Sequence, residues 1–171
     1  MYVSTFALLA RYNRETNAEM NGFIRQLDDG QWNREFKGYF NSVKALCNHL
    51  YISDFTWLKR FSGLRDFLYI KSPLFREDVR FGTVVLEGVE DYIEKRERLD
   101  EMIVRFTSEI VPADFDRLLS FTDSHGVSHE KPFGGLVLHF FNHQTHHRGM
   151  ISLYLEHMDI ANDYSSLMNL L

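Results

Sequence analysis

Histidine is concentrated in one short stretch, LHFFNHQTHHRGM, in which four of the chain's eight histidines fall within nine residues. If this stretch is helical, His139, His143 and His147 follow at steps of four and form one stripe that drifts by about 40° per step. Neutral imidazole nitrogen is a common ligand of transition metals, and an i, i+4 pair binds one ion without bending the helix. The pattern therefore favours a metal site over chance clustering.

Two ligands from one helix leave the coordination shell incomplete, and a facing helix of a bundle normally completes it. His49, within ALCNHLYISDFTW, is the candidate because it lies among apolar residues of a second expected helix. A lone histidine in such a position is more often a core or surface residue, so only the cluster makes His49 a candidate ligand. Spacing leaves two roles open for His139, a further ligand or a side chain that supports the ligands. His146 lies off the stripe and either lines the pocket or faces a partner.

The remaining histidines have simpler interpretations. His125 and His129 lie in a turn-rich segment, where a solvent-exposed role is expected. His157 lies near the end of its helix and, when protonated, faces the negative end of the helix dipole. No Ser-His-Asp order, phosphate-binding glycine loop or paired carboxylate motif indicates another chemistry, and no catalytic residue is assigned.

Three other side chains bear on the site. Asp54 follows His49 by five residues, and a solvated or N–H-bonded carboxylate is favoured over one that orients a ligand or acts as a base. Cys47 is the only cysteine, which excludes an internal disulfide, and its apolar neighbours indicate a buried structural thiol. Arg148 is the basic residue nearest the histidine pair, and either a pocket role or an outward role on the helix surface fits it.

Helical periodicity and capping signals predict the elements that must position these residues. Asp28 and Asp29 end the first helix, Asn41 or Ser42 caps the second, and Pro132 begins the fourth. The charged run at 90–101 reads as the solvated face of the third. The expected elements are helices over residues 5–27, 42–61, 84–110 and 132–158, a hairpin over 115–130 and a short final helix over 164–171. The expected fold is all-α, an antiparallel four-helix bundle with a small hairpin before the last long helix, in one domain over 1–171.

Composition excludes several classes of protein. The net charge of −5, without a basic run, disfavours a protein that binds nucleic acid. No stretch reaches 18 apolar residues, so no membrane span is expected. The first residues have no basic region ahead of their apolar run, so no signal peptide is expected and a cytoplasmic location follows as the default.

The stretch NHQTHHRGM resembles the N-H-x-x-H-H-R-G-Q signature of the DinB/YfiT-like family of metalloenzymes. The resemblance extends to the upstream N-H-L segment, the helix lengths and the hairpin, and so covers nearly the whole chain. It implies one divalent ion per chain, Ni²⁺ or Zn²⁺, bound by His49, His143 and His147. Met150 stands where the family has Gln, which leaves the ligands intact but removes any polar role at that position.

Three imidazoles leave a coordination position for water or substrate, as in catalytic metal sites. A bound divalent ion lowers the pKa of water or of a thiol, so either a hydrolase or a thiol S-transferase is expected. The resemblance implies a low-molecular-weight thiol such as bacillithiol or mycothiol as a possible substrate, and a homodimer. The alternative is a non-catalytic metal-binding stress-response protein that acts through a partner.

Overall fold

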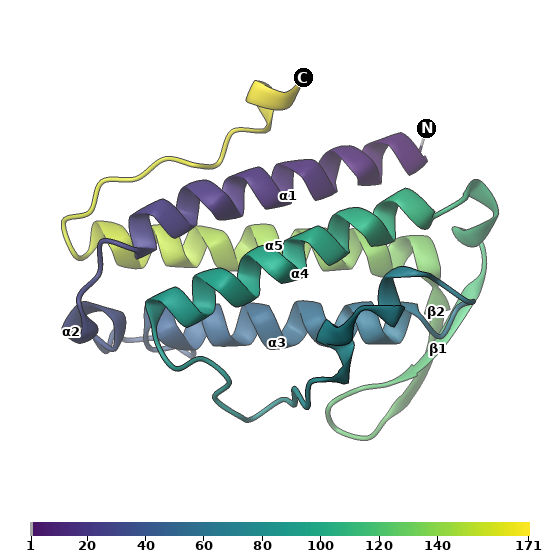
Figure 1. The fold of residues 1–171 in the computed structure, drawn as a ribbon, viewed down its shortest axis with the longest axis horizontal. Helices are drawn as coiled ribbons and strands as arrows, with labels where there is room; N and C mark the ends of the chain where they lie inside the picture. Colours follow the sequence, from purple (N-terminus) through teal and green to yellow (C-terminus); the bar gives the residue numbers. More distant parts are fainter. Residues whose placement is uncertain (1) are drawn as a thin grey trace.

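Four long helices make up most of the chain and lie side by side (Figure 1). The computed structural model describes residues 2–171 and adds a short helix, a hairpin and several 3₁₀ turns. The mostly helical class predicted from the sequence is confirmed. The elements are α1 (Tyr2–Ile24), α2 (Asp29–Trp32), α3 (Val43–Phe61), α4 (Val89–Glu109), β1 (Leu118–Thr122), β2 (Ser128–Pro132) and α5 (Phe133–Glu156), with 3₁₀ turns at Tyr69–Lys71, Pro73–Arg76, Pro112–Asp114 and Leu167–Leu170.

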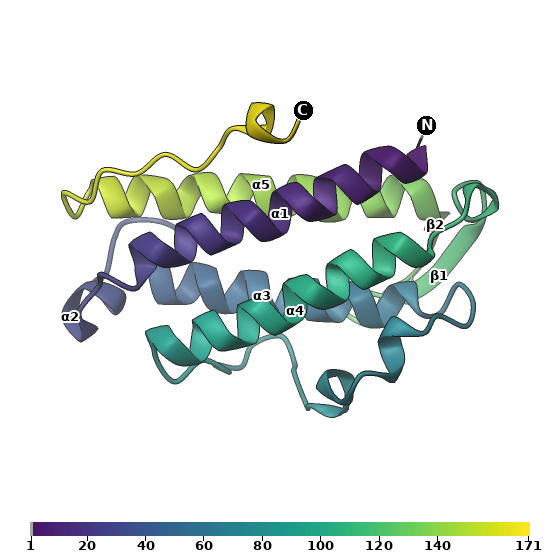
Figure 2. The same cartoon turned by 45° about the horizontal axis from the view of Figure 1, so that its top comes forward.

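Each long helix has one antiparallel and one parallel neighbour. Helix α1 packs antiparallel to α4, and α3 packs antiparallel to α5 (Figure 2). By contrast, α3 and α4 run in the same direction. Residues 62–88 cause this, because they return along the length of α3 before α4 begins (Figure 1). The antiparallel packing expected from the sequence therefore describes two of the neighbouring pairs, and the long return makes the other two parallel.

Local signals explain most helix ends. Ser42 caps α3 as predicted, and its Oγ accepts the N–H of Ala45 at 3.1 Å. Pro132 directly precedes α5, also as predicted. The third long helix starts at Val89 rather than near residue 84, because Asn48 binds the N–H of Val85 and holds that segment extended.

The two ends of the chain differ slightly from expectation. The first helix covers Tyr2–Ile24 instead of 5–27, because Asp28 caps a separate helix, α2, with Gln31 as its partner. The final helix expected over 164–171 is reduced to a 3₁₀ turn at Leu167–Leu170. Neither difference affects the histidines.

The predicted hairpin forms between β1 and β2, with Phe121 opposite His129. Its turn is organised by Asp123, whose Oδ1 accepts the N–H groups of His125 at 2.8 Å and Val127 at 3.0 Å. Gly126 provides the left-handed backbone that this turn requires, with φ of 80°. Within residues 2–171, no helix combines the length and apolar character that crossing a membrane requires.

Two apolar clusters fill the space between the helices, one toward each end. Between them lies a set of buried polar side chains, which we call the polar layer and which comes from all four long helices. This arrangement corrects the prediction for the charged run 90–101, because Arg96 and Asp100 are buried within it. The polar layer consists of Asn13, Asn17, Asp54, Arg96, Asp100 and Arg148.

Candidate metal centre

The structure brings His49 of α3 together with His143 and His147 of α5. The Nε2 atom of His143 lies 3.1 Å from the Nε2 atom of His49 and 3.1 Å from that of His147. All three candidate ligand atoms lie within 4.8 Å of one another, so the group could hold a metal ion. The antiparallel contact of α3 with α5 places His49 opposite the i, i+4 pair.

Electrostatics favour the neutral, metal-binding form of all three rings. Burial, with a smaller contribution from the other histidines, lowers the pKa of His143 to about 3 and that of His147 to about 4. Burial also lowers the pKa of His49. The three neutral rings direct the lone pairs of their Nε2 atoms toward one another, and these lone pairs repel. A metal cation between them compensates this repulsion better than the one or two protons that the rings can share.

Aromatic packing holds these rings in place. Phe40 lies against His49 with ring centroids 4.3 Å apart and meets His147 edge-on at 5.3 Å. The Nδ1 atoms of His143 and His147 are buried and have no hydrogen-bond partner among the described residues. Ring contacts, rather than hydrogen bonds from protein groups, therefore orient these side chains.

The two histidines with open roles lie beside the cluster. His139 is exposed, with its ring 6.0 Å from that of His143 and 5.6 Å from that of Trp57. His146 is exposed and meets His147 edge-on at 4.9 Å. Neither belongs to the group whose ligand atoms converge within the part of the chain that the structure describes.

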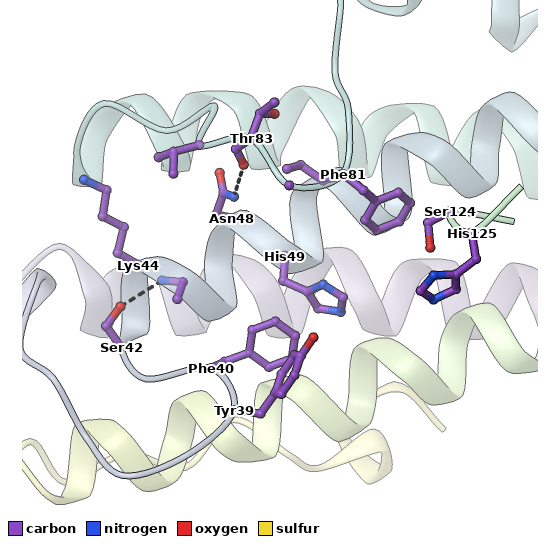
Figure 3. A pocket seen from close by; sticks show the side chains of 14 residues that line it. Tyr39, Phe40, Ser42, Lys44, Asn48, His49, Phe81, Thr83, Ser124 and His125 are labelled. Carbon is purple, nitrogen blue, oxygen red and sulfur yellow. Dashed lines mark hydrogen bonds between the residues drawn. The ribbon is translucent and has the colours of Figure 1, made fainter.

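A pocket of about 740 Å³ opens at the cluster, with His49 on its wall (Figure 3). Its lining residues come from α3 and from three segments around it: the connector before α3 (39–42), the loop before α4 (81–84) and the tip of the hairpin (124–125). His125, at the tip of the hairpin, is exposed as predicted. It also lines this pocket, a position that the sequence did not predict. His129 instead lies 2.8 Å from the carboxylate of Asp123.

Asn48 is a site residue that sequence reasoning missed. Its Nδ2 donates to the carbonyl of Thr83 at 2.8 Å, and its Oδ1 accepts the N–H of Val85 at 2.9 Å (Figure 3). Asn48 therefore fastens one wall of the pocket to the helix that carries His49. Its place directly before His49 in the N-H-L segment was the available signal, but its partners lie more than 30 residues away.

Asp54 is an N–H-bonded carboxylate, one of the two forms that the sequence favoured, but it is not solvated. It is fully buried, and its Oδ2 accepts from Nη1 of Arg96 at 2.6 Å. The other Nη of Arg96 donates to Asp100 at 2.8 Å. Burial raises the pKa of both carboxyl groups, while their negative charges raise the pKa of Arg96. Asp54 therefore holds α3 to α4 and is neither solvated nor aimed at a ligand.

Arg148 does not take the outward position that was one of the two roles left open for it. It is buried and donates to Asn13, and Asn13 in turn donates to Asp100 at 2.9 Å. Two arginines and two aspartates thus balance in charge within the polar layer. Cys47 is buried as predicted, and burial raises the pKa of its thiol.

The fold and the site define a helical protein with three converging imidazoles, one of which, His49, lines a pocket. A model of the DinB family matches residues 1–159, and the chain belongs to the DinB family. It is similar to Protein DinB of Bacillus subtilis (strain 168), with 26% identity over 162 residues that cover 93% of this chain and 90% of that protein. The family resemblance seen in the sequence is thereby confirmed.

Proposed function

We propose that the chain is a metal-dependent enzyme that binds one Ni²⁺ or Zn²⁺ ion through His49, His143 and His147 within a four-helix bundle. The observation that carries this proposal is the convergence of three Nε2 atoms, two pairs of which lie 3.1 Å apart. An all-imidazole donor set suits these borderline ions better than Mg²⁺ or Ca²⁺, which prefer oxygen.

The pocket favours an enzyme over a protein that only holds the ion. A site that stores or senses a metal needs no cavity of about 740 Å³ beside its ligands, whereas a small-molecule substrate does. A bound divalent ion supplies an activated water or thiolate near neutral pH. The residues of the chain then bind the substrate, and Phe40 packs against the rings of His49 and His147.

Two reaction classes share this chemistry, hydrolysis and thiol transfer. A low-molecular-weight thiol is the co-substrate we propose for the second. Lys44 lines the pocket and is the basic residue that we propose binds the carboxylates of the thiol. Arg148 is unsuited to that role, because it is committed to the polar layer.

Metal analysis tests the proposal directly. Protein purified without chelators is expected to carry close to one equivalent of nickel, zinc or a similar divalent ion, and chelated protein is expected to regain one equivalent on titration. Thiol-transfer and hydrolysis assays on the loaded and chelated forms then test catalysis. Absence of binding in excess metal would contradict the site. Binding without any metal-dependent turnover across both assay panels would favour the non-catalytic alternative.

A further inference from the structure

Large apolar side chains gather, unusually exposed, around the mouth of the pocket. Tyr39 is 92% exposed, Val84 72% and Phe81 40%, and all three line the same cavity. Exposed apolar groups that cluster at one cavity mark a binding surface more often than scattered ones do. Tyr39 belongs to the connector before α3, whereas Phe81 belongs to the loop before α4 on another side of the pocket (Figure 3).

The rings on the connector side continue down to the metal ligands. Tyr39 meets Phe40 edge-on with centroids 4.8 Å apart, and Phe40 lies against His49 at 4.3 Å. An apolar wall therefore extends from the pocket mouth to the imidazole cluster. A molecule that packs along this wall reaches His49, the candidate ligand that lines the pocket, with its inner end.

Both walls are fixed to the helices. The carbonyl of Phe40 accepts from the hydroxyl of Tyr154 at 2.7 Å, which ties the connector to α5. Asn48 ties the opposite wall to α3 through Thr83 and Val85. A preorganised site loses less entropy when a ligand binds, so these anchors favour binding of a specific ligand over nonspecific apolar binding.

Polar side chains line the pocket as well, but Ser42, Lys44 and Asn48 already have hydrogen-bond partners. No carboxylate lines it within the described chain, and the oxygen of Ser42 is used as a helix cap. Lys44 donates to Asn33 at 3.4 Å. We propose that this pocket binds the apolar, ring-bearing part of the substrate between Tyr39 and Phe81 and directs its reacting end to the histidines. The inference rests on the proposed function for the chemistry at that end.

A fluorescent aromatic anion, 1-anilinonaphthalene-8-sulfonate, serves as the probe. Titrated into the zinc-loaded chain, the dye is expected to bind saturably at one site. Phe81→Ala is expected to weaken binding by roughly tenfold, the effect of losing one ring contact of about 1 to 1.5 kcal/mol. Tyr39→Ala is expected to act in the same direction, and its high exposure means that it leaves folding unaffected. Phenylacetate should displace the dye at concentrations where acetate does not.

Tyr2→Ala is the matched control, because Tyr2 is an exposed ring beside a different groove. The inference is overturned if both pocket variants bind the dye as the parent does, if Tyr2→Ala is the variant that loses it, or if acetate competes as well as phenylacetate. The metal content of each variant is measured in parallel. Dye binding without metal binding would count against the proposed function alone, and metal binding without dye binding against this inference alone.

Discussion

The Nε2 atom of His143 lies between those of His49 and His147, so its imidazole is the centre of the candidate ligand set. Each of the three side chains contributes one donor, and losing any one leaves two. His139 and His146 contact the cluster through their rings only. At the scale of single residues, the eight histidines therefore divide into three candidate ligands, two neighbours and three others.

Alanine substitutions test this division. His49→Ala, His143→Ala and His147→Ala should each weaken metal binding by more than the roughly 10 to 100-fold expected for losing a group that only supports a ligand. His139→Ala should have a weak or intermediate effect. His129→Ala and His125→Ala should leave metal affinity unchanged, although His125 lines the pocket. Isothermal titration of each variant measures the effect.

Two results would revise the assignment. An effect of His139→Ala as large as that of His143→Ala would make His139 a ligand. Full metal affinity in His49→Ala would remove the ligand that α3 supplies and leave the i, i+4 pair alone.

The lowered pKa values of the histidines predict how acid affects the metal-free chain. An unfolded histidine titrates near about 6.5, whereas folded His143 and His147 titrate at about 3 and about 4. Between those values the unfolded chain binds protons that the folded chain does not, so stability falls as the pH falls below about 6.5. Urea unfolding in chelator at several pH values measures this slope.

The variant His143→Ala/His147→Ala provides the comparison, because all other titrating groups are shared with the parent. Its stability should depend less on pH between about 6.5 and about 4. An equal slope in parent and variant would show that the folded histidines take up protons as freely as the unfolded ones.

At the scale of elements, the polar layer joins the four long helices. Arg96 of α4 binds Asp54 of α3, and Asn13 of α1 binds both Asp100 of α4 and Arg148 of α5. Arg148 directly follows the candidate ligand His147. The layer therefore fixes the rotation of α5 beside the site while the apolar clusters fill the two ends.

Removing Arg96 should be strongly destabilising. Arg96→Met leaves Asp54 and Asp100 buried without their counter-ion, which costs about 3 to 5 kcal/mol. Arg98→Met is the matched control on the same helix, because Arg98 makes an exposed pair with Glu77 at 3.4 Å and should cost less than about 1 kcal/mol. Urea denaturation compares the two. Similar losses in both variants would contradict a central role for the layer.

At the scale of the whole molecule, exposed apolar groups also lie beside a groove between the first turns of α1 and α5. Tyr2 and Leu138 line it and are 63% and 58% exposed, with Phe6 and Leu9 beneath them. We propose that this face forms a two-fold homodimer, since a symmetric pair of such patches can cover itself.

Sedimentation tests the dimer. The parent chain should sediment as a dimer at high micromolar concentration, and Leu138→Lys should shift it toward the monomer because a charge would be buried in the interface. Lys substituted for the exposed Leu153 of the same helix serves as the control. A monomeric parent would contradict the proposal.

The sequence alone was sufficient wherever the deciding interaction is local. Helical periodicity depends on neighbours three and four residues apart, so the long helices, the Ser42 cap and the Pro132 start were predictable. The pairing of His143 with His147 is local in the same sense. His49 lies 94 residues from His143, so no local pattern pairs the two, and His49 became a candidate only through the incomplete shell of the cluster and the family resemblance.

Tertiary structure decided the features whose partners are distant. Arg96 and Asp100 appear in a charged run that reads as a solvated face, and their burial depends on Asp54 and Asn17 from other helices. Asn48 forms a wall of the pocket only because residues 62–88 return along α3, which also makes α3 and α4 parallel. A side chain's own helix sets the direction in which it points, but the helices packed against it determine whether it meets water, a counter-ion or another imidazole.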